Sequence, residues 1–433
     1  MAINKIKFIV MSATPLPRKH INFSLEALRG FASLFVVWHH VQVFPYMLDP
    51  KYKLHGPFSY GPSGHFCVLL FFVLSGYVIG LSNKESLEWN TVGLYLKKRF
   101  IRLYPIFFVT LLLTLLTIPK SFSLISISQN IVLLQSVLGP DINPPSWSLH
   151  YEVLYYLLFI FISIFQLNPI TCACLAFLIG ISNYLLFPLI AAPVISSYSY
   201  GMVFWLLGLA MSRYLRQARQ DDINVRVLLS CIFFILCIDQ YNVFLTLMHR
   251  VTDALHTQLT FPTSLPWSQI AISFMDLAYL PFALLFVLLF TDKHIPHKLT
   301  ILWIILASCA LTFGYVAKHA YQGDLDWSKF ALPTIFFIAT WLILLIRSDW
   351  VEKAGRVLVL QIGVWLGSLS YGIYLIHVPL MFLFNRIKQF SGTPLTFSVR
   401  FLLLLLLTLS GSYFLEQILQ PKIKLLLFKP IRL

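Results

Sequence analysis

Charged side chains are scarce in this chain of 433 residues, and acidic side chains are the scarcest. Only 11% of the residues are Asp, Glu, Lys or Arg, and 17 acidic residues stand against 32 basic ones. A soluble domain carries about 25% charged residues, so this sequence cannot cover a globular surface with polar groups. The shortage of charge therefore excludes a soluble globular protein.

Cysteine is also rare, and its spacing excludes several kinds of site. The six cysteines lie within or at the start of apolar stretches, and no two form a Cys-X-X-Cys pair or another clear metal-ligand spacing. The 12 histidines are scattered as well, whereas a zinc site needs several such ligands together. We expect the cysteines to be small apolar residues, and we expect no metal site.

Long apolar runs are abundant. Hydrophobic residues make up 58% of the chain, and runs of roughly 18 to 23 residues recur, each long enough to cross a bilayer as an α-helix. This pattern predicts an all-α, polytopic transmembrane helical bundle with about ten to twelve spans. The runs centre on residues 26–46, 66–82, 100–118, 148–166, 170–190, 199–216, 227–247, 270–291, 299–317, 330–347, 361–384 and 397–419.

Basic residues gather in short segments between these runs, and the segments recur at alternate loops. They lie at 97–102, 213–219, 293–298, 347–356 and 422–432, on the same predicted side as Arg18 and Lys19. The positive-inside rule makes that side the cytoplasm, so both termini are expected there. The net charge of +15 is thus explained by topology, and no nucleic-acid partner is expected.

The same reasoning divides the chain into three parts. Residues 1–24 are predicted to form a cytoplasmic N-terminal segment, 25–420 a transmembrane domain, and 421–433 a basic cytoplasmic tail. The transmembrane domain is expected to be surrounded by membrane lipid.

Arg29 and His40 lie eleven residues apart in the first apolar run. Eleven residues turn an α-helix by three full turns plus ~20° and climb roughly 16 Å, so both side chains share a face. Ionisable groups inside a membrane are costly and usually functional, and a neutral imidazole can act as a general base. His39 points about 100° away. The alternative is a cytoplasmic anchor at Arg29 and a histidine hydrogen-bonded within the bundle.

Two further segments carry candidate residues. Arg99 and Arg102 point the same way on a helix. They form either an ordinary basic helix end or an anion clamp for a phosphorylated ligand such as a coenzyme A thioester. Glu152 lies one turn inside a predicted span, where a carboxylate must be paired, protonated or in contact with water. Trp147 before it suits a helix start at the membrane interface.

Two other motifs remain open on physical grounds alone. Ser75 and Gly76 favour close helix packing. Tyr371, Tyr374 and His377 share a stretch that either joins helices through polar contacts or lines a substrate cavity.

Taken together, these segments resemble the acyltransferase 3 family of integral membrane O-acyltransferases. The motifs are Arg-X10-His at 29–40, Phe-Phe-Val-Leu-Ser-Gly at 71–76, Arg-X-X-Arg at 99–102, Trp-Ser-Leu-X-X-Glu at 147–152, Ser-Tyr-Gly-Ile-Tyr-Leu-Ile-His at 370–377, and Glu416 before Pro421. They occur in the expected order over nearly the whole chain. Two departures are the extra spans beyond the usual ten and the lack of the soluble esterase-like domain that some relatives carry.

The resemblance implies transfer of an acyl group, often acetyl, from cytoplasmic acyl-coenzyme A to a hydroxyl of a cell-surface glycan such as O-antigen or capsule. It implies His40 as catalytic base or transient acyl carrier, assisted by Arg29, with Glu152 as a site carboxylate. Arg99 and Arg102 would hold the donor phosphates. The residues assigned to substrate binding are Trp147, Ser148, Tyr371, Tyr374 and His377.

The same resemblance implies a bacterial inner membrane location and possible partner proteins of glycan assembly. No bound cofactor is expected, since acyl-coenzyme A is a substrate. The rival hypothesis is a secondary transporter that uses intramembrane His, Arg and Glu as proton or substrate sites. Against it, the sequence shows no paired Gly- or Pro-broken helices in corresponding halves.

Overall fold

The computed structural model describes residues 23–118, 120–135, 138–186, 193–254 and 270–428. The described residues are 79% helical, and no β-strand occurs in these ranges. The predicted all-α, polytopic bundle is confirmed. Nearly all of the predicted N-terminal segment, with Arg18 and Lys19, lies outside the described residues, as does the end of the predicted tail.

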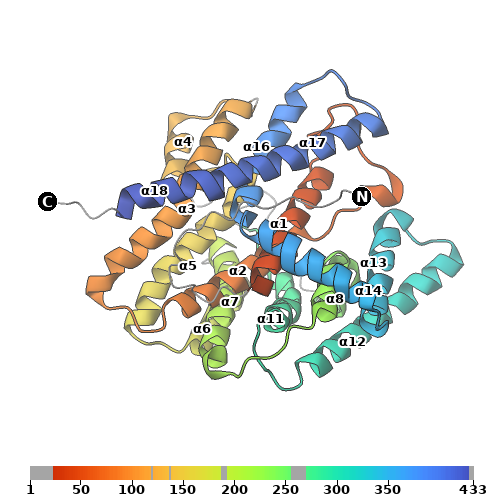
Figure 1. The fold of residues 1–433 in the computed structure, drawn as a ribbon, viewed down its shortest axis with the longest axis horizontal. Coiled ribbons are helices and arrows are strands. Elements are labelled where there is room, and N and C mark those ends of the chain that lie inside the picture. The colour runs from red at the N-terminus through yellow and green to blue at the C-terminus, as the bar shows by residue number, and fades with distance from the viewer. Residues whose placement is uncertain (1–22, 119, 136–137, 187–192, 255–269, 429–433) are drawn as a thin grey trace, which may run out of the picture.

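Eighteen α-helices follow one another along the described chain (Figure 1). They are α1 (Phe23–Val43), α2 (Gly64–Ser82), α3 (Trp89–Thr117), α4 (Leu124–Ile131), α5 (Trp147–Ile164), α6 (Pro169–Leu186), α7 (Pro193–Tyr214), α8 (Val225–Ile235), α9 (Ile238–Tyr241), α10 (Val243–Ala254), α11 (Leu280–Leu289), α12 (Lys298–Gln322), α13 (Trp327–Leu345), α14 (Asp349–Gly355), α15 (Val364–Gly367), α16 (Ser370–Arg386), α17 (Pro394–Tyr413) and α18 (Gln420–Phe428). Two π-helical segments, Arg356–Gly363 and Phe414–Leu419, join α14 to α15 and α17 to α18.

Seven helices in the described ranges are long and apolar enough to cross a membrane, or eight if one bent pair forms a single span. This count is below the ten to twelve runs that hydropathy suggests. Helix α1 has 21 residues, but Glu26, Arg29, His39 and His40 lower its mean hydropathy. Helix α8 has only 11 residues, because the predicted span 227–247 is divided into α8, α9 and α10.

The predicted span 361–384 is not one straight helix. Its two parts, Asp349–Gly367 and Ser370–Arg386, meet at a bend of 70°. Gly367 and Ser368 lie at this bend, and Gly/Ser pairs are a common cause of sharp kinks. The bend separates α16, which contributes to the candidate site, from the preceding helices.

Close approaches between helix backbones set the positions of α1 and α2. A Cβ atom added at Gly76 of α2 would lie 1.9 Å from the Trp205 carbonyl oxygen of α7. One added at Gly367 would lie 2.0 Å from the Glu26 carbonyl oxygen of α1. Only glycine allows these contacts, as is common between membrane helices. The prediction that Gly76 serves packing is confirmed.

Burial separates central helices from those at the margin of the bundle. In the most apolar part of each span, 72% of the residues are buried for the span that contains α2, but only 22% for α12 and 17% for α13. Figure 1 shows α12 and α13 at the edge of the molecule, with α2 and α7 in its interior. The exposed apolar faces of α12 and α13 are suited to contact with lipid.

Arg400 of α17 is a buried cation that sequence analysis did not single out. Its side chain donates five hydrogen bonds of 2.6–3.0 Å to backbone carbonyl oxygens. The acceptors are Leu48, Phe384, Ile387, Gln389 and Phe390. Carbonyls at a helix C-terminus lack intrahelical partners, so Arg400 satisfies those at the end of α16 and fixes this helix against α17.

Candidate active site

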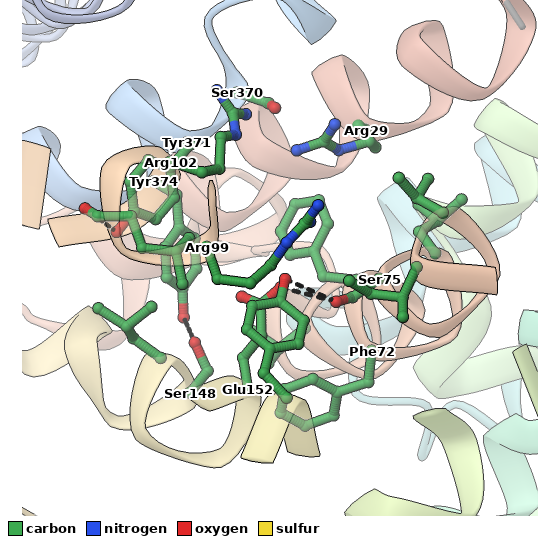
Figure 2. A pocket seen from close by; sticks show the side chains of 18 of the residues that line it. Arg29, Phe72, Ser75, Arg99, Arg102, Ser148, Glu152, Ser370, Tyr371 and Tyr374 are labelled. Atoms are coloured by element: carbon green, nitrogen blue, oxygen red, sulfur yellow. Dashed lines mark hydrogen bonds between the residues drawn. The ribbon is translucent and has the colours of Figure 1, made fainter. Parts of the chain in front are cut away.

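A cavity of about 130 Å³ lies among α1, α2, α3, α5 and α16 (Figure 2). Seven of the ten residues that the sequence assigns to a site line it. They are Arg29, Arg99, Arg102, Ser148, Glu152, Tyr371 and Tyr374. Segments up to about 345 residues apart in the sequence thus line one cavity.

Three arginines face this cavity, and their partners differ. Arg29 forms an ion pair of 3.2 Å with Glu26, one turn earlier on α1. Arg102 forms one of 2.9 Å with Glu416. Arg99 has no ion pair in the described part of the chain, and its buried Nε atom has no hydrogen-bond partner there. Arg99 is therefore the cation that is free to take an anionic ligand.

Aromatic rings hold the Arg99 side chain in place. Its guanidinium carbon lies 5.7 Å from the centre of the Tyr95 ring and 5.8 Å from that of Tyr156. Figure 2 shows Arg99 extending into the space between Arg29 and Glu152. Cation–π contacts orient a guanidinium without neutralising its charge, so the positive charge remains available within the cavity.

The Arg102–Glu416 pair depends on a proline in α3. Pro105 has no backbone N–H, so the Ile101 carbonyl lacks its usual helical donor. The Gln420 amide donates to this oxygen at 3.4 Å and to the Arg102 carbonyl at 2.8 Å, and accepts from the Arg102 guanidinium at 3.2 Å. These bonds dock the start of α18 on α3. They bring Glu416, in the adjoining π-helical segment, next to Arg102.

Glu152 is held by side chains from two other positions, one of which is supported by a third. It accepts hydrogen bonds from the Ser75 hydroxyl at 2.7 Å and from the Tyr156 hydroxyl. The Trp205 indole N–H in turn donates to Ser75 at 3.3 Å. Tyr156 thus reaches Glu152 from one turn along α5, whereas the adjacent Tyr155 donates to the backbone of Tyr198. Ser75 supports this site carboxylate, a role that its motif did not disclose.

Tyr371 and Tyr374 line the cavity from α16, and each contacts another wall of it. The Tyr371 hydroxyl donates to the Leu103 carbonyl at 2.9 Å, and the Tyr374 hydroxyl is 2.8 Å from the Ser148 hydroxyl. Pro379 frees the Leu375 carbonyl of α16, and Asn143 donates to it at 3.1 Å. These contacts fix the start of α5 against α16.

Trp147 is placed differently from the other predicted residues. It does not line the cavity but stacks on His65, with ring centres 6.2 Å apart and planes inclined by 16°. His65 is paired with Asp276 at 3.0 Å. Trp147 therefore packs behind the wall of the cavity, and its predicted role in substrate binding remains a prediction.

His40 and His377 form a direct contact with each other. Neither lines the cavity, but His40 Nδ1 is 2.7 Å from His377 Nε2. His377 follows Tyr374 by three residues, so both lie on the same face of α16. His39 has a separate partner, since its Nδ1 is 2.8 Å from the Pro62 carbonyl oxygen. The expectation that His39 and His40 point in different directions agrees with these contacts.

The described part of the chain contains no candidate metal site. No group of three or more His, Cys, Asp or Glu side chains lies close enough together there to hold a metal ion. The chemistry that the described residues can supply is acid–base or nucleophilic chemistry at His40, with cationic binding at Arg99 and a hydrogen-bonded carboxylate at Glu152.

Comparison with known proteins identifies the class. The family model described as "Acyltransferase domain" matches residues 22–299 and 291–417, which is nearly the whole chain. The chain therefore belongs to the acyltransferase 3 family, as its motifs predicted. These matches include every residue assigned to the candidate site.

Two curated proteins are similar to parts of the chain. "Protein 2 in picA locus" of Rhizobium radiobacter is 36% identical over 105 residues, which cover 24% of this chain and 47% of that protein. "Acyltransferase MdmB" of Streptomyces mycarofaciens is 31% identical over 152 residues, covering 31% of this chain and 38% of that protein. The chain thus spans less than half the length of either relative. No solved structure matches it.

Proposed function

We propose that this multi-pass membrane protein is an O-acyltransferase that moves an acetyl group from acetyl-coenzyme A to a hydroxyl of a cell-surface glycan. The observation that carries the proposal is the unpaired Arg99 in a cavity that is also lined by Glu152. Guanidinium groups bind phosphate oxygens well. The membership in the acyltransferase 3 family supports the same chemistry.

The size of the cavity supports a short acyl group. At about 130 Å³ it is smaller than the pockets of about 300–1,000 Å³ that enclose drug-sized ligands. It is too small to enclose a whole coenzyme A, so the adenosine would remain outside while the phosphates reach Arg99. Exposed Lys97 and Lys98 on α3 precede Arg99, so the nucleotide end would lie towards this basic surface, which we place at the cytoplasm.

In the proposed reaction, Arg99 binds the donor phosphates and the thioester carbonyl lies near His40. The hydroxyl proton of the acceptor passes to the His40 imidazole as the new C–O bond forms and the C–S bond breaks. The proton then passes to the departing thiolate, which leaves as free coenzyme A. In the alternative order, His40 first carries the acetyl group itself. Both routes have the same net balance.

The proposed acceptor is an envelope glycan or its lipid-linked precursor, and the proposed location is a bacterial inner membrane. Partner proteins of glycan assembly would supply the acceptor and remove the product. The family resemblance supports these assignments.

Release of free thiol tests the proposed function against transport. Purified protein in nanodiscs is mixed with acetyl-coenzyme A and lipid-linked glycan from the expression host, and thiol is measured together with O-acetyl groups on the glycan. An acyltransferase produces both in equal amounts. Uptake of substrate into proteoliposomes with no thiol release would overturn the proposal in favour of a transporter.

Substitution Arg99→Gln is expected to weaken donor binding. Loss of a charge-assisted hydrogen bond raises KM for acetyl-coenzyme A by about 10- to 100-fold, with a smaller change in kcat. The control is Lys353→Gln, which also removes one positive charge but from an exposed side chain of α14, away from the cavity and from the basic surface at Lys97 and Lys98.

A substrate without phosphate sharpens this measurement. S-acetyl-pantetheine lacks the anion that Arg99 is proposed to bind, so wild type and Arg99→Gln should share one KM for it. Equal loss of affinity for both donors would instead show that Arg99 shapes the cavity and does not bind phosphate.

A further inference from the structure

We propose that His377 is a positioning residue that fixes the tautomer of His40, so that Nε2 of His40 is the reactive nitrogen. This inference rests on the proposed function and extends it to a specific atom. In this role His377 acts through His40 and does not bind the substrate itself. The observations are two hydrogen bonds that run in series from α1 to the backbone of α16.

The first step concerns His377, whose Nδ1 lies 3.0 Å from the Ile373 carbonyl oxygen. A carbonyl oxygen only accepts hydrogen bonds, so Nδ1 of His377 carries the proton of this bond. In a neutral ring the other nitrogen, Nε2, then has no proton and is an acceptor. The backbone of α16 therefore determines the tautomer of His377.

The tautomer of His377 in turn determines the tautomer of His40. Its Nδ1 is 2.7 Å from the acceptor nitrogen of His377, so Nδ1 of His40 must donate. A neutral His40 then has its lone pair on Nε2, the nitrogen that can take a proton or attack a thioester carbonyl. The direction of both bonds follows from one fixed acceptor, the Ile373 carbonyl oxygen.

The opposite arrangement requires a doubly protonated His377. Its side chain is completely buried, and no ion pair joins either ring to a carboxylate in the described part of the chain. A buried imidazolium without a counter-charge is strongly disfavoured in a membrane protein. The resting pair is therefore neutral.

The same pair can hold one proton during the reaction. When Nε2 of His40 accepts a proton, Nδ1 continues to donate to His377, and the bond becomes charge-assisted and stronger. Transfer of the shared proton to His377 leaves that ring bonded to Ile373 through Nδ1. The positive charge is thus distributed over two rings without a carboxylate partner.

The test compares two substitutions of one buried position. His377→Leu removes the acceptor and retains apolar volume, whereas the side-chain oxygen of His377→Gln can occupy the position of Nε2 and accept from His40. We expect kcat for thiol release to fall about 100-fold in His377→Leu with KM for acetyl-coenzyme A little changed. The kcat of His377→Gln should be at least about tenfold higher than that of His377→Leu.

A second measurement observes the tautomer itself. ¹⁵N spectra of histidine-labelled protein in nanodiscs should show His40 protonated at Nδ1 in wild type and in His377→Gln. In His377→Leu the proton should redistribute to Nε2. An unchanged His40 spectrum in His377→Leu would overturn the inference even if that variant is less stable, because a merely structural residue would not alter the tautomer.

The outcomes separate this inference from the proposed function. If wild type releases no thiol, the function fails. If His40→Ala is inactive while His377→Leu keeps the wild-type kcat, the function stands and the positioning role is wrong. If His377→Gln is as impaired as His377→Leu, hydrogen-bond acceptance is not what His377 contributes, and the inference is also wrong.

Discussion

Replacing His40 with alanine is expected to lower acetyl transfer by about 1,000-fold or more, because both proposed routes use its imidazole. The substitution also leaves Nε2 of buried His377 without its hydrogen-bond partner. The measurement is O-acetylation of cell-surface glycan by NMR, supported by thiol release from purified protein. Wild type and variants are compared at equal amounts of protein in the membrane.

His39→Ala is the matched control for this prediction. It removes the same ring from the adjacent position of α1, but its hydrogen bond goes to the Pro62 carbonyl and not to His377. We expect glycan O-acetylation within about threefold of wild type, as for a group outside the reaction. Normal O-acetylation in both variants would show that His40 is structural and that the proposed mechanism is wrong.

Relations within one helix were accessible from the sequence. The eleven-residue spacing placed Arg29 and His40 on one continuous helix, which the structure has as α1. Hydropathy located most helices, because length and apolar composition are local properties of the chain. The same approach did not find the bend between α15 and α16, since a 70° change of direction depends on packing as well as on the Gly367–Ser368 pair.

Relations between helices were not accessible in this way. His40 and His377 are 337 residues apart, and Arg102 and Glu416 are 314 apart. Composition and periodicity say which side chains are costly in a membrane but not which ones meet. The family motifs named most of these residues, yet they assigned Arg102 and Arg99 one shared role. The structure shows that their partners differ, and this difference leads to a separate expectation for each.

Arg102→Met is expected to destabilise the protein by about 1–3 kcal/mol, because it leaves a buried carboxylate without its cation. The Glu416 side chain is only 2% exposed, whereas that of Arg102 is 39% exposed. The effect of breaking the pair is therefore asymmetric. Glu416→Gln leaves a cation that can reach the cavity and keeps an oxygen to accept from the Gly372 N–H, so about 1 kcal/mol is expected.

The double variant Arg102→Met, Glu416→Gln completes the cycle. With no buried charge left uncompensated, it should regain much of the stability lost in Arg102→Met. Thermal unfolding in detergent micelles gives the order of the variants. Arg29→Met is the comparison, since Arg29 and Glu26 are 25% and 27% exposed and such pairs contribute about 0–1 kcal/mol.

If Glu416→Gln proved more damaging than Arg102→Met, the carboxylate would not be the buried member that needs a cation. Arg102 would then be free for the donor phosphates, and the division of roles between Arg99 and Arg102 would have to be reversed.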